Sequence, residues 1–468
     1  MRLSLGLTTV VSFLVAPALA FHIPTHHASA ASAASAAPSY SHATTSTTSL
    51  SVAAGIDIIT NDGLVVGEAD RSFRQGMQYE RFGLFRAAAE SFHEAATLYQ
   101  CFLDQFDDVA EEAEDESTAD DESETLPAAA NAFAYVTGRD VNTCLPILAY
   151  ACIRLAHLSH DALGDSKAAA RLYKDAAAID PMPSSVAFDG IGTSIEASGG
   201  SLEDAVEAYR EAYRLNPSSA QAGFHLAVAL ERLGRVEESE PLMEQLRRSE
   251  AKVSCLVDSW GYVRWHTRKE MMDANLHRGT RSMLQIGLQA AMPMIRNDNG
   301  LVCEFGVATG RSTRMIQEIL PLGTEIHGFD TFTGIPQAWG DEPAGSYSTG
   351  GAVPNIEGKV SWHKGLFKDT IPPFLESLKS EDEENNYQPL AFANVDCDLY
   401  SSTLDVLERM HSRIVPGTVL VFDEYLGHPT WRQDEFRAWR ECCKRFGWQY
   451  RYLGFSLSTK QAVVQLVD

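Results

Sequence analysis

The sequence lacks the cysteine pairs that cross-link small domains as disulfides or bind zinc. Its 468 residues include eight cysteines, but none belongs to a C-x-x-C pair or has a histidine at the spacing of zinc ligands. Isolated cysteines of this kind are typical of free thiols in a reducing compartment. Stability must come from hydrophobic cores instead, and 45% apolar residues in a chain long enough for two or three domains can supply them.

The sequence is also poor in basic residues. Lys and Arg number 38 against 63 Asp and Glu, which gives a formal net charge of −25. Because nucleic-acid binding needs clustered Lys and Arg, this balance excludes nucleic acid as a partner. The acids are concentrated in two places, since residues 104–124 hold twelve acids and no base and SEDEEN stands at 380–385. We expect a disordered acidic insertion at 104–125 and an exposed loop at the second run.

Long apolar runs are missing after the N-terminus, so the sequence predicts no membrane span in the mature chain. Arg2, an apolar run and the small residues of APALA predict a signal peptide over residues 1–20. Residues 21–56 are rich in Ser, Thr, Ala and His and contain neither acid nor base. With Phe21 first after the cut, this segment resembles the transit part of plastid presequences in algae with complex plastids. We therefore expect a plastid location, with secretion or the endomembrane system as the alternative.

Residues 70–250 repeat a pattern of small and aromatic positions. It is present in GMQYERFGLFRAAAESFHEAATLY, in LGDSKAAARLYKDAAAIDP and in GGSLEDAVEAYREAYRLNP, with a fourth unit over 222–246. Pro181 and Pro217, which end the second and third units, lie 36 residues apart. Small residues let paired helices approach, and aromatic residues fill the space between them. The pattern resembles tetratricopeptide arrays and predicts an all-α solenoid that the acidic insertion interrupts.

The role of these repeats stays open at the level of sequence. The concave surface of such an array can bind a protein partner or a second copy of the chain. The array can equally pack on the following domain and serve only as architecture.

From residue 255 to 468 the pattern changes to alternating strands and helices. Short apolar runs predict strands at 301–307, 325–330, 360–365, 389–396 and 418–425. Helical stretches lie between or after them, and the chain closes with two more strands, YRYLGFSLS and QAVVQLVD. Repeated strand and helix units predict an α/β fold with a Rossmann-like parallel sheet covered on both faces. The terminal hairpin adds an antiparallel strand.

The predicted parallel strands end in residues suited to chemistry. The first ends in the glycine loop EFGVATGRS, and the later strands end in Asp330, Asp396, Asp398, Asp423 and Glu424. In such a sheet these ends share one edge, where ligands bind. A glycine loop with an acid on the second strand is typical of a nucleoside ligand, but the G-x-G-x-x-G of dehydrogenases is absent.

The series EFGVATGRS, GFDTFTGIP, HKGLFKDTIP, NVDCDLYSST and PGTVLVFDEY resembles the macrocin O-methyltransferase family over about the last 190 residues. Members of this family are metal-dependent class I methyltransferases that use S-adenosylmethionine to methylate sugar or phenol hydroxyls of natural products. The resemblance implies an enzyme with this methyl donor, with Mg²⁺ or another divalent cation, and with a small-molecule acceptor.

The resemblance also assigns roles by position. The residues that it implies for the methyl donor are Glu304, Gly306, Gly310, Ser312, Asp330, Gly365 and Phe367. It gives the metal to Asp396, Asp423 and Glu424, and makes Asp398 the base. Glu424 departs from the family, which usually has Asp there, so its reach toward a metal differs.

The chemistry explains why two acids would close one strand. A neutral hydroxyl is a poor nucleophile, a divalent cation lowers its pKa, and a nearby carboxylate can take its proton. Asp396 and Asp398 point the same way along a strand and can reach one site because the strand ends there. Alternatively, Asp398 caps the helix that starts near Ser401, or the acids only solvate a loop.

Residues 331–358 form a long Gly-rich loop that we expect to act as a lid. Substrate contacts are expected there, in residues 262–272, and around His428, Trp431 and Arg432, where packing is the alternative. Three other functions stay open. Asp-Cys-Asp also fits the D-x-D metal motif of nucleotide-sugar transferases, the repeats could be a scaffold beside an inactive domain, or they could recruit a protein substrate to an active one.

Overall fold

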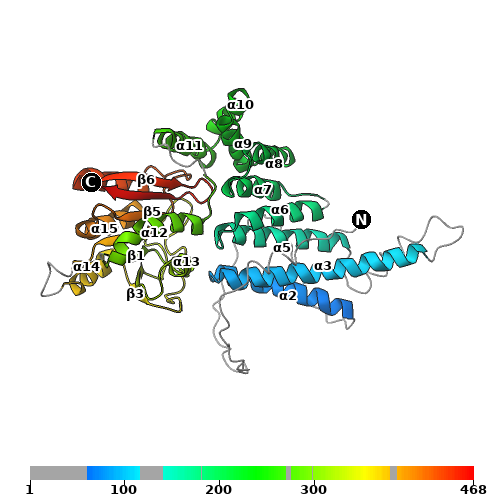
Figure 1. Ribbon diagram of the computed structural model, residues 1–468, viewed down its shortest axis with the longest axis horizontal. Coiled ribbons are helices and arrows are strands. Elements are labelled where there is room, and N and C mark those ends of the chain that lie inside the picture. The colour runs from blue at the N-terminus through cyan, green and yellow to red at the C-terminus, as the bar shows by residue number, and fades with distance from the viewer. Residues whose placement is uncertain (1–60, 116–140, 181, 270–275, 298, 380–386) are drawn as a thin grey trace, which may run out of the picture.

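The computed structural model describes residues 61–115, 141–180, 182–269, 276–297, 299–379 and 387–468. The predicted signal peptide, the transit-like segment, residues 116–125 of the acidic insertion and the loop at 380–385 lie outside these residues. A helical array and an α/β domain stand side by side in Figure 1. No helix in the described ranges is long and apolar enough to cross a membrane.

The array consists of helices that pack on their neighbours in chain order. They are α2 (Asn61–Arg81), α3 (Phe85–Asp115), α5 (Val141–Asp161), α6 (Ser166–Ile179), α7 (Ser185–Ala197), α8 (Leu202–Leu215), α9 (Ala220–Arg232), α10 (Val236–Arg247) and α11 (Ala251–Lys269). The predicted all-α solenoid is confirmed. Helix α11 spans residue 255, where we expected the next domain to begin.

Small residues let these helices approach closely. A Cβ atom on Gly190 would lie 2.5 Å from the ring of Tyr173, and one on Gly192 would lie 2.4 Å from the ring of Tyr209. Side-chain caps begin the helices, as where Ser201 accepts a hydrogen bond from the amide of Asp204 at 3.3 Å. The repeating small and aromatic positions of the sequence therefore mark the crossings of the helix pairs.

The acidic insertion was expected to be disordered from residue 104 onward, and this is wrong for its first part. Helix α3 continues through residues 104–115 and ends at Asp115. Glu and Ala, which recur in this part of the chain, favour a helix that has already begun at an amphipathic segment.

The α/β domain is built on one seven-stranded sheet of order β3-β2-β1-β4-β5-β7-β6. The strands are β1 (Leu301–Phe305), β2 (Ile326–Asp330), β3 (Val360–Lys364), β4 (Leu390–Val395), β5 (Val419–Phe422), β6 (Gln449–Phe455) and β7 (Ala462–Val467). Strands β1 to β5 pair in parallel, whereas β7 is antiparallel to both β5 and β6. The Rossmann-like sheet and its terminal hairpin are confirmed.

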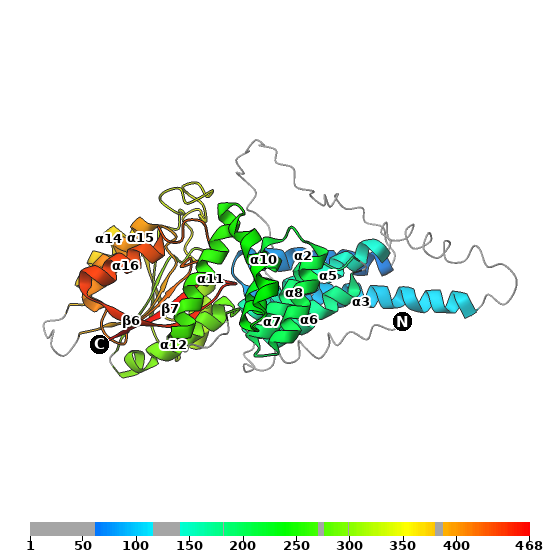
Figure 2. The same cartoon turned by 90° about the horizontal axis from the view of Figure 1, so that it is seen from above.

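Helices cover both faces of this sheet (Figure 2). They are α12 (Thr280–Asn297), α13 (Arg311–Ile319), α14 (Phe367–Ser377), α15 (Tyr400–Met410), the 3₁₀ turn η1 (His411–Arg413) and α16 (Glu435–Phe446). One core joins α12 and α13 to the sheet and continues into helices α2 to α6 of the array, with Leu155, Met283 and Val302 among its members. The array and the α/β domain therefore share a hydrophobic core.

Candidate active site

A pocket of about 400 Å³ lies at the carboxyl ends of the parallel strands. The predicted residues that line it are Gly306, Asp330, Gly365, Phe367, Asp396, Asp398, Asp423 and Glu424. A larger hollow of about 650 Å³ runs along α11, but none of the strand-end acids lines it. The edge of the sheet chosen from the sequence is therefore the edge where the acids and the glycine loop meet.

The glycine loop after β1 is held by backbone contacts. Gly306 has a φ of +91°, and a Cβ atom there would lie 1.8 Å from the carbonyl oxygen of Asp396. Asp330 Oδ2 accepts hydrogen bonds from the amides of Val307 and Ala308, both at 2.8 Å. The acid at the end of β2 therefore fixes the shape of the loop and also lines the pocket. Oδ1 of Asp330 accepts a third hydrogen bond, from the amide of Phe332 at 2.6 Å. A carboxylate has four acceptor positions, so one remains for a ligand hydroxyl.

Three residues predicted for the methyl donor do not line the pocket. Glu304 is fully buried beneath α13, where its carboxylate accepts hydrogen bonds from Thr313 and, at 3.1 Å, from Asn394. Burial raises the pKa of Glu304 to about 7, against the lowering effect of its hydrogen bonds, one of which comes from Ser312. Gly310 is covered instead by Pro354 and Ile356 of the lid. Glu304 and Ser312 therefore connect β1 to the start of α13, and Gly310 lies against the lid.

Gly365 and Phe367, which the resemblance implies for the methyl donor, also line the pocket. Gly365 has a φ of +146°, and its amide donates to the carbonyl oxygen of Asp330 at 2.9 Å. Phe367 begins α14 and packs edge to face on Phe305 of β1 at 5.8 Å between ring centroids. The arrangement offers an apolar ring beside a tight backbone turn.

Three carboxylates of the pocket repel one another. Burial raises the pKa of Asp396 well above its usual value, and the charges of Asp423 and Asp398 raise it further. Burial and the charge of Asp423 likewise raise the pKa of Asp398 to about 7. Burial also raises the pKa of Asp423, although the amide of Gln461 opposes this by donating to it. The site is rich in buried negative charge and suits a positive ligand or a proton.

Asp398 adopts a strained conformation. Its φ is +56°, in the left-handed region that residues other than Gly rarely occupy. The amide of Leu399 donates to the carbonyl oxygen of Cys397 at 2.5 Å, so Asp398 is the middle residue of a tight turn. This turn follows β4 directly and leaves Asp398 on the pocket wall, while Cys397 is buried. Strain at a pocket residue is typical of a functional position.

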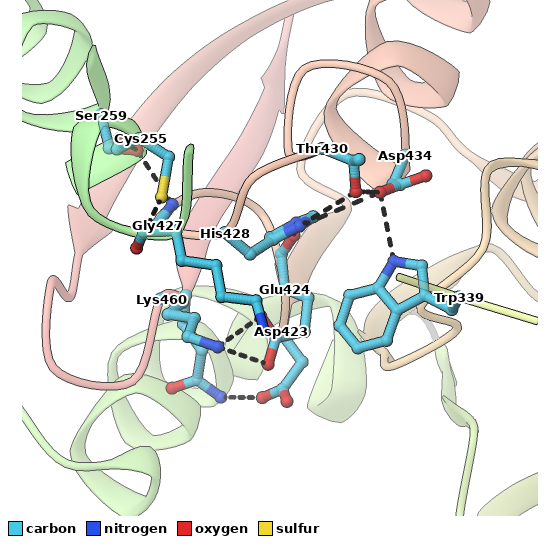
Figure 3. Close-up of polar contacts among 12 residues, drawn as sticks. Cys255, Ser259, Trp339, Asp423, Glu424, Gly427, His428, Thr430, Asp434 and Lys460 are labelled. Carbon is cyan, nitrogen blue, oxygen red and sulfur yellow. Dashed lines mark hydrogen bonds and ion pairs between the residues drawn. The ribbon is translucent and has the colours of Figure 1, made fainter. Parts of the chain in front are cut away.

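Glu424 was predicted to bind a metal, but it is bonded to Lys460 (Figure 3). The ammonium of Lys460 donates to both carboxylate oxygens of Glu424, at 3.3 and 3.2 Å. Burial raises the pKa of Glu424 to about 7 even though the Lys460 charge opposes the shift. In the part of the chain that the structure describes, no three His, Cys, Asp or Glu side chains are arranged to hold a metal ion.

The hairpin between β6 and β7 supplies residues that the sequence did not reveal. Lys460 and Gln461 reach from this hairpin to the acids that follow β5. Glu435, which begins α16, is fully buried and accepts a hydrogen bond from the amide of Cys397 at 3.0 Å. Burial raises the pKa of Glu435 well above its usual value. A lone Lys in a turn and an acid at a helix start carry no signal of such contacts.

The lid contributes aromatic residues to the pocket, namely Trp339 and Tyr347. The indole of Trp339 donates to Asp434 at 3.1 Å and packs edge to face on His428 (Figure 3). Trp431 and Arg432, expected near a substrate, instead bind Asp258 of α11 at 3.1 and 2.8 Å. Neither of them lines this pocket, and Arg432 lines the larger hollow along α11.

Comparisons with known proteins agree with this architecture. A family model described as a methyltransferase domain matches residues 303–425, and one described as a TPR repeat matches residues 194–234. No curated protein matches the chain.

Solved structures with a similar chain path include methyltransferases. The calicheamicin methyltransferase CalS11 is 21% identical, with a TM-score of 0.31, over 49% of this chain and 92% of its own. The O-methyltransferase NovP is 20% identical, with a TM-score of 0.30, over 46% and 97%. An O-methyltransferase from Bacillus cereus in complex with SAH is 14% identical, with a TM-score of 0.26, over 50% and 97%. These likenesses leave the reaction and substrate open, and the family models carry the conclusion that the chain contains a methyltransferase domain and a tetratricopeptide repeat.

Proposed function

We propose that the chain is an S-adenosylmethionine-dependent O-methyltransferase that acts on a hydroxyl group of a small molecule, such as a sugar or a phenol-like natural product. One observation carries the proposal. The glycine loop and the half-buried acids of three strand ends line the same pocket of about 400 Å³, within a methyltransferase domain. The resemblance to macrocin O-methyltransferases supports the choice of oxygen as the acceptor atom.

The donor would bind in the part of the pocket that is lined by the glycine loop, Asp330, Gly365 and Phe367. Gly306 and Asp330 both line the pocket, and Asp330 has one acceptor position left for a ribose hydroxyl. Gly365 and Phe367 would flank the adenine. Bound there, S-adenosylmethionine supplies an electrophilic methyl group next to the acids.

Asp398 would act as the base. The acceptor oxygen forms the new bond to the methyl carbon as the carbon–sulfur bond breaks, and the acceptor proton goes to a carboxylate oxygen of Asp398. A pKa of about 7 makes this carboxylate a suitable base near neutrality, because both of its protonation states are accessible there. The products are a methyl ether and S-adenosylhomocysteine.

A divalent cation, expected to be Mg²⁺, is part of the proposal. The acids fit such an ion in kind and charge, since Asp396 and Asp423 are half-buried carboxylates with raised pKa values. These two would hold the ion, and Glu424 would join them only if Lys460 released it. When bound, the ion lowers the pKa of an acceptor hydroxyl.

The function is tested with labelled S-adenosylmethionine, the full chain and a fractionated cell extract, with and without a chelator. We expect label in a small molecule, and a higher melting temperature when the donor or its product is present. Label in a protein would instead favour repeats that recruit a protein substrate. If the chain neither binds the donor nor transfers label, the alternative that remains is a scaffold with an inactive domain.

A further inference from the structure

The turn that joins α2 to α3, at the start of the array, lies against the glycine loop. Gly83, between α2 and α3, has a φ of +68°. A Cβ atom on Gly83 would lie 3.0 Å from Cβ and 3.1 Å from Cα of Arg311, and 3.2 Å from Oγ1 of Thr309. Thr309 belongs to the loop and Arg311 is the first residue of α13. The array therefore touches the segment that would bind the donor.

A second contact comes from the end of α5. Asp161, the last residue of this helix, is 5% exposed. Its Oδ1 atom accepts a hydrogen bond from the amide of Thr280 at 2.7 Å, and Oδ2 pairs with the guanidinium of Arg311. A Cβ atom on Gly279 would lie 2.5 Å from Cα of Asp161, so the chain before α12 is pressed against the same residue. Asp161 thus joins α5, α12 and α13.

Arg311 connects this junction with the pocket. Burial lowers the pKa of Arg311, and the charges of Asp423 and Asp396 in the pocket act on its guanidinium in the opposite direction. Its backbone follows Gly310 directly, where the loop turns into α13. A displacement of Arg311 would therefore move the loop and change the charge that the pocket acids experience.

The other end of α13 is also tied to the array. Glu318 accepts hydrogen bonds from Arg86 of α3 at 3.0 and 3.1 Å, and from Arg281 of α12 at 2.8 Å. The ends of α3 and α5 face α13 in Figure 1. The pair between Arg86 and Glu318 is largely exposed and contributes little by itself. It nevertheless shows that the array contacts α13 at both ends.

We infer that the repeat region is part of the donor site, with Asp161 as a positioning residue that acts through Arg311 on the glycine loop. The inference rests on the proposed function. It gives α2, α3 and α5 a task that needs no partner protein, and it predicts that the array sets the affinity for the methyl donor.

The test compares Asp161→Asn with Asp165→Ala in the full chain. Asp165 caps α6 four residues further on, through the amide of Ala168 at 2.9 Å, and therefore controls for damage to the array. We expect Asp161→Asn to weaken the binding of S-adenosylhomocysteine by roughly tenfold, because a charge-assisted bond to Arg311 is lost. Asp165→Ala removes this cap, so it should lower the melting temperature and leave this affinity unchanged. Asp161→Glu should restore part of the affinity.

Calorimetric titration with S-adenosylhomocysteine and thermal unfolding are measured for each variant. Lower melting temperatures with an unchanged dissociation constant for Asp161→Asn would reduce Asp161 to a structural role and overturn the inference. Equal losses of affinity in both variants would overturn it as well. If the unaltered chain binds no S-adenosylhomocysteine, the proposed function itself fails, and this outcome is distinct from the other two.

Discussion

The carbonyl oxygen of Asp396 lies 1.8 Å from the point that a Cβ atom on Gly306 would occupy. The backbone at the end of β4 thus fills the space beside the glycine loop of β1. The amide of Asp396 also donates to the carbonyl oxygen of Phe305 at 2.8 Å, so the two strand ends are locked together. The donor loop and the acid motif can adopt their positions only with glycine at residue 306.

Replacing Gly306 by Ala should therefore abolish donor binding. The left-handed backbone alone costs about 1–2 kcal/mol for a residue with a Cβ atom, and the overlap with Asp396 adds to this cost. Isothermal titration with S-adenosylhomocysteine and the free energy of unfolding from urea denaturation measure the two effects. Gly261→Ala in α11 is the control, because a Cβ atom there would meet nothing within 4 Å. Donor binding by Gly306→Ala at the original affinity would contradict the prediction.

Much of this arrangement could be predicted from the sequence because it follows from the order of elements. Apolar runs that end in acids predicted the parallel strands, and the carboxyl ends of such strands share one edge of a sheet. Asp330, Asp396 and Asp423 meet in one pocket for this reason. Glu304 was misplaced because side chains alternate along a strand, and its side chain faces α13 and not the pocket.

Contacts between distant segments could not be predicted in this way. Lys460 meets Glu424 because the β6–β7 hairpin returns beside β5, and neither residue has a motif that marks the pair. Asp161 meets Arg311 across 150 residues of sequence. Both pairs form only when folding brings distant segments together, so no local pattern in the sequence predicts them. The acidic segment was misjudged for another reason, since its composition is compatible with a helix that begins outside it.

Replacing Asp398 by Asn should lower kcat by a factor of about 10² to 10⁴, because an amide cannot take the acceptor proton. Donor binding should persist, since Asp398 does not touch the glycine loop. The control is Asp405→Asn, because Asp405 lines the same pocket but pairs with Arg409 at 2.6 Å. Single-turnover transfer from labelled donor measures the rate. A similar fall in both variants would show that pocket charge, and not a base at residue 398, sets the rate.

Replacing Lys460 by Met should raise the affinity of the site for a divalent cation. The change removes the ammonium from Glu424 and leaves its carboxylate free to join Asp396 and Asp423. The concentration of Mg²⁺ needed for half-maximal activity should therefore fall, by roughly tenfold for a gain of about 1.4 kcal/mol in binding. Lys460→Arg preserves the charge and is the control. An unchanged Mg²⁺ requirement would show that Glu424 has no part in metal binding.

Replacing Trp339 by Ala should raise the KM for the acceptor and leave donor affinity unchanged. Trp339 belongs to the lid and lines the pocket, while its indole nitrogen is anchored on Asp434 at 3.1 Å. Trp339→Phe separates two contributions, because it retains an aromatic ring and loses the hydrogen bond. Steady-state kinetics with an acceptor from the extract measures both variants. A fall in donor affinity would mean that the lid serves the methyl donor and not the acceptor.

The last prediction concerns His160 and the dependence of stability on pH. His160 is 9% exposed near the junction of α5 and α12, and burial together with the charge of His157 lowers its pKa to about 4. In the unfolded chain the imidazole of His160 takes up a proton near pH 6.5. The contribution of neutral His160 to folding stability is therefore fully present above that pH. Its contribution is lost as the pH falls toward 4.

Because of His160, the free energy of unfolding should therefore be about 2 kcal/mol lower at pH 5 than at pH 7.5. Other groups titrate in the same range, and the raised pKa values of Glu304 and Glu424 act in the opposite direction. A single variant isolates the histidine. In His160→Gln the difference in unfolding free energy between the two pH values should change by this amount, in favour of the fold at pH 5. Urea denaturation at both pH values measures it, and comparison within each protein removes the cost of the substitution itself. An identical pH dependence in both proteins would mean that His160 takes up its proton as readily in the folded chain as in the unfolded one.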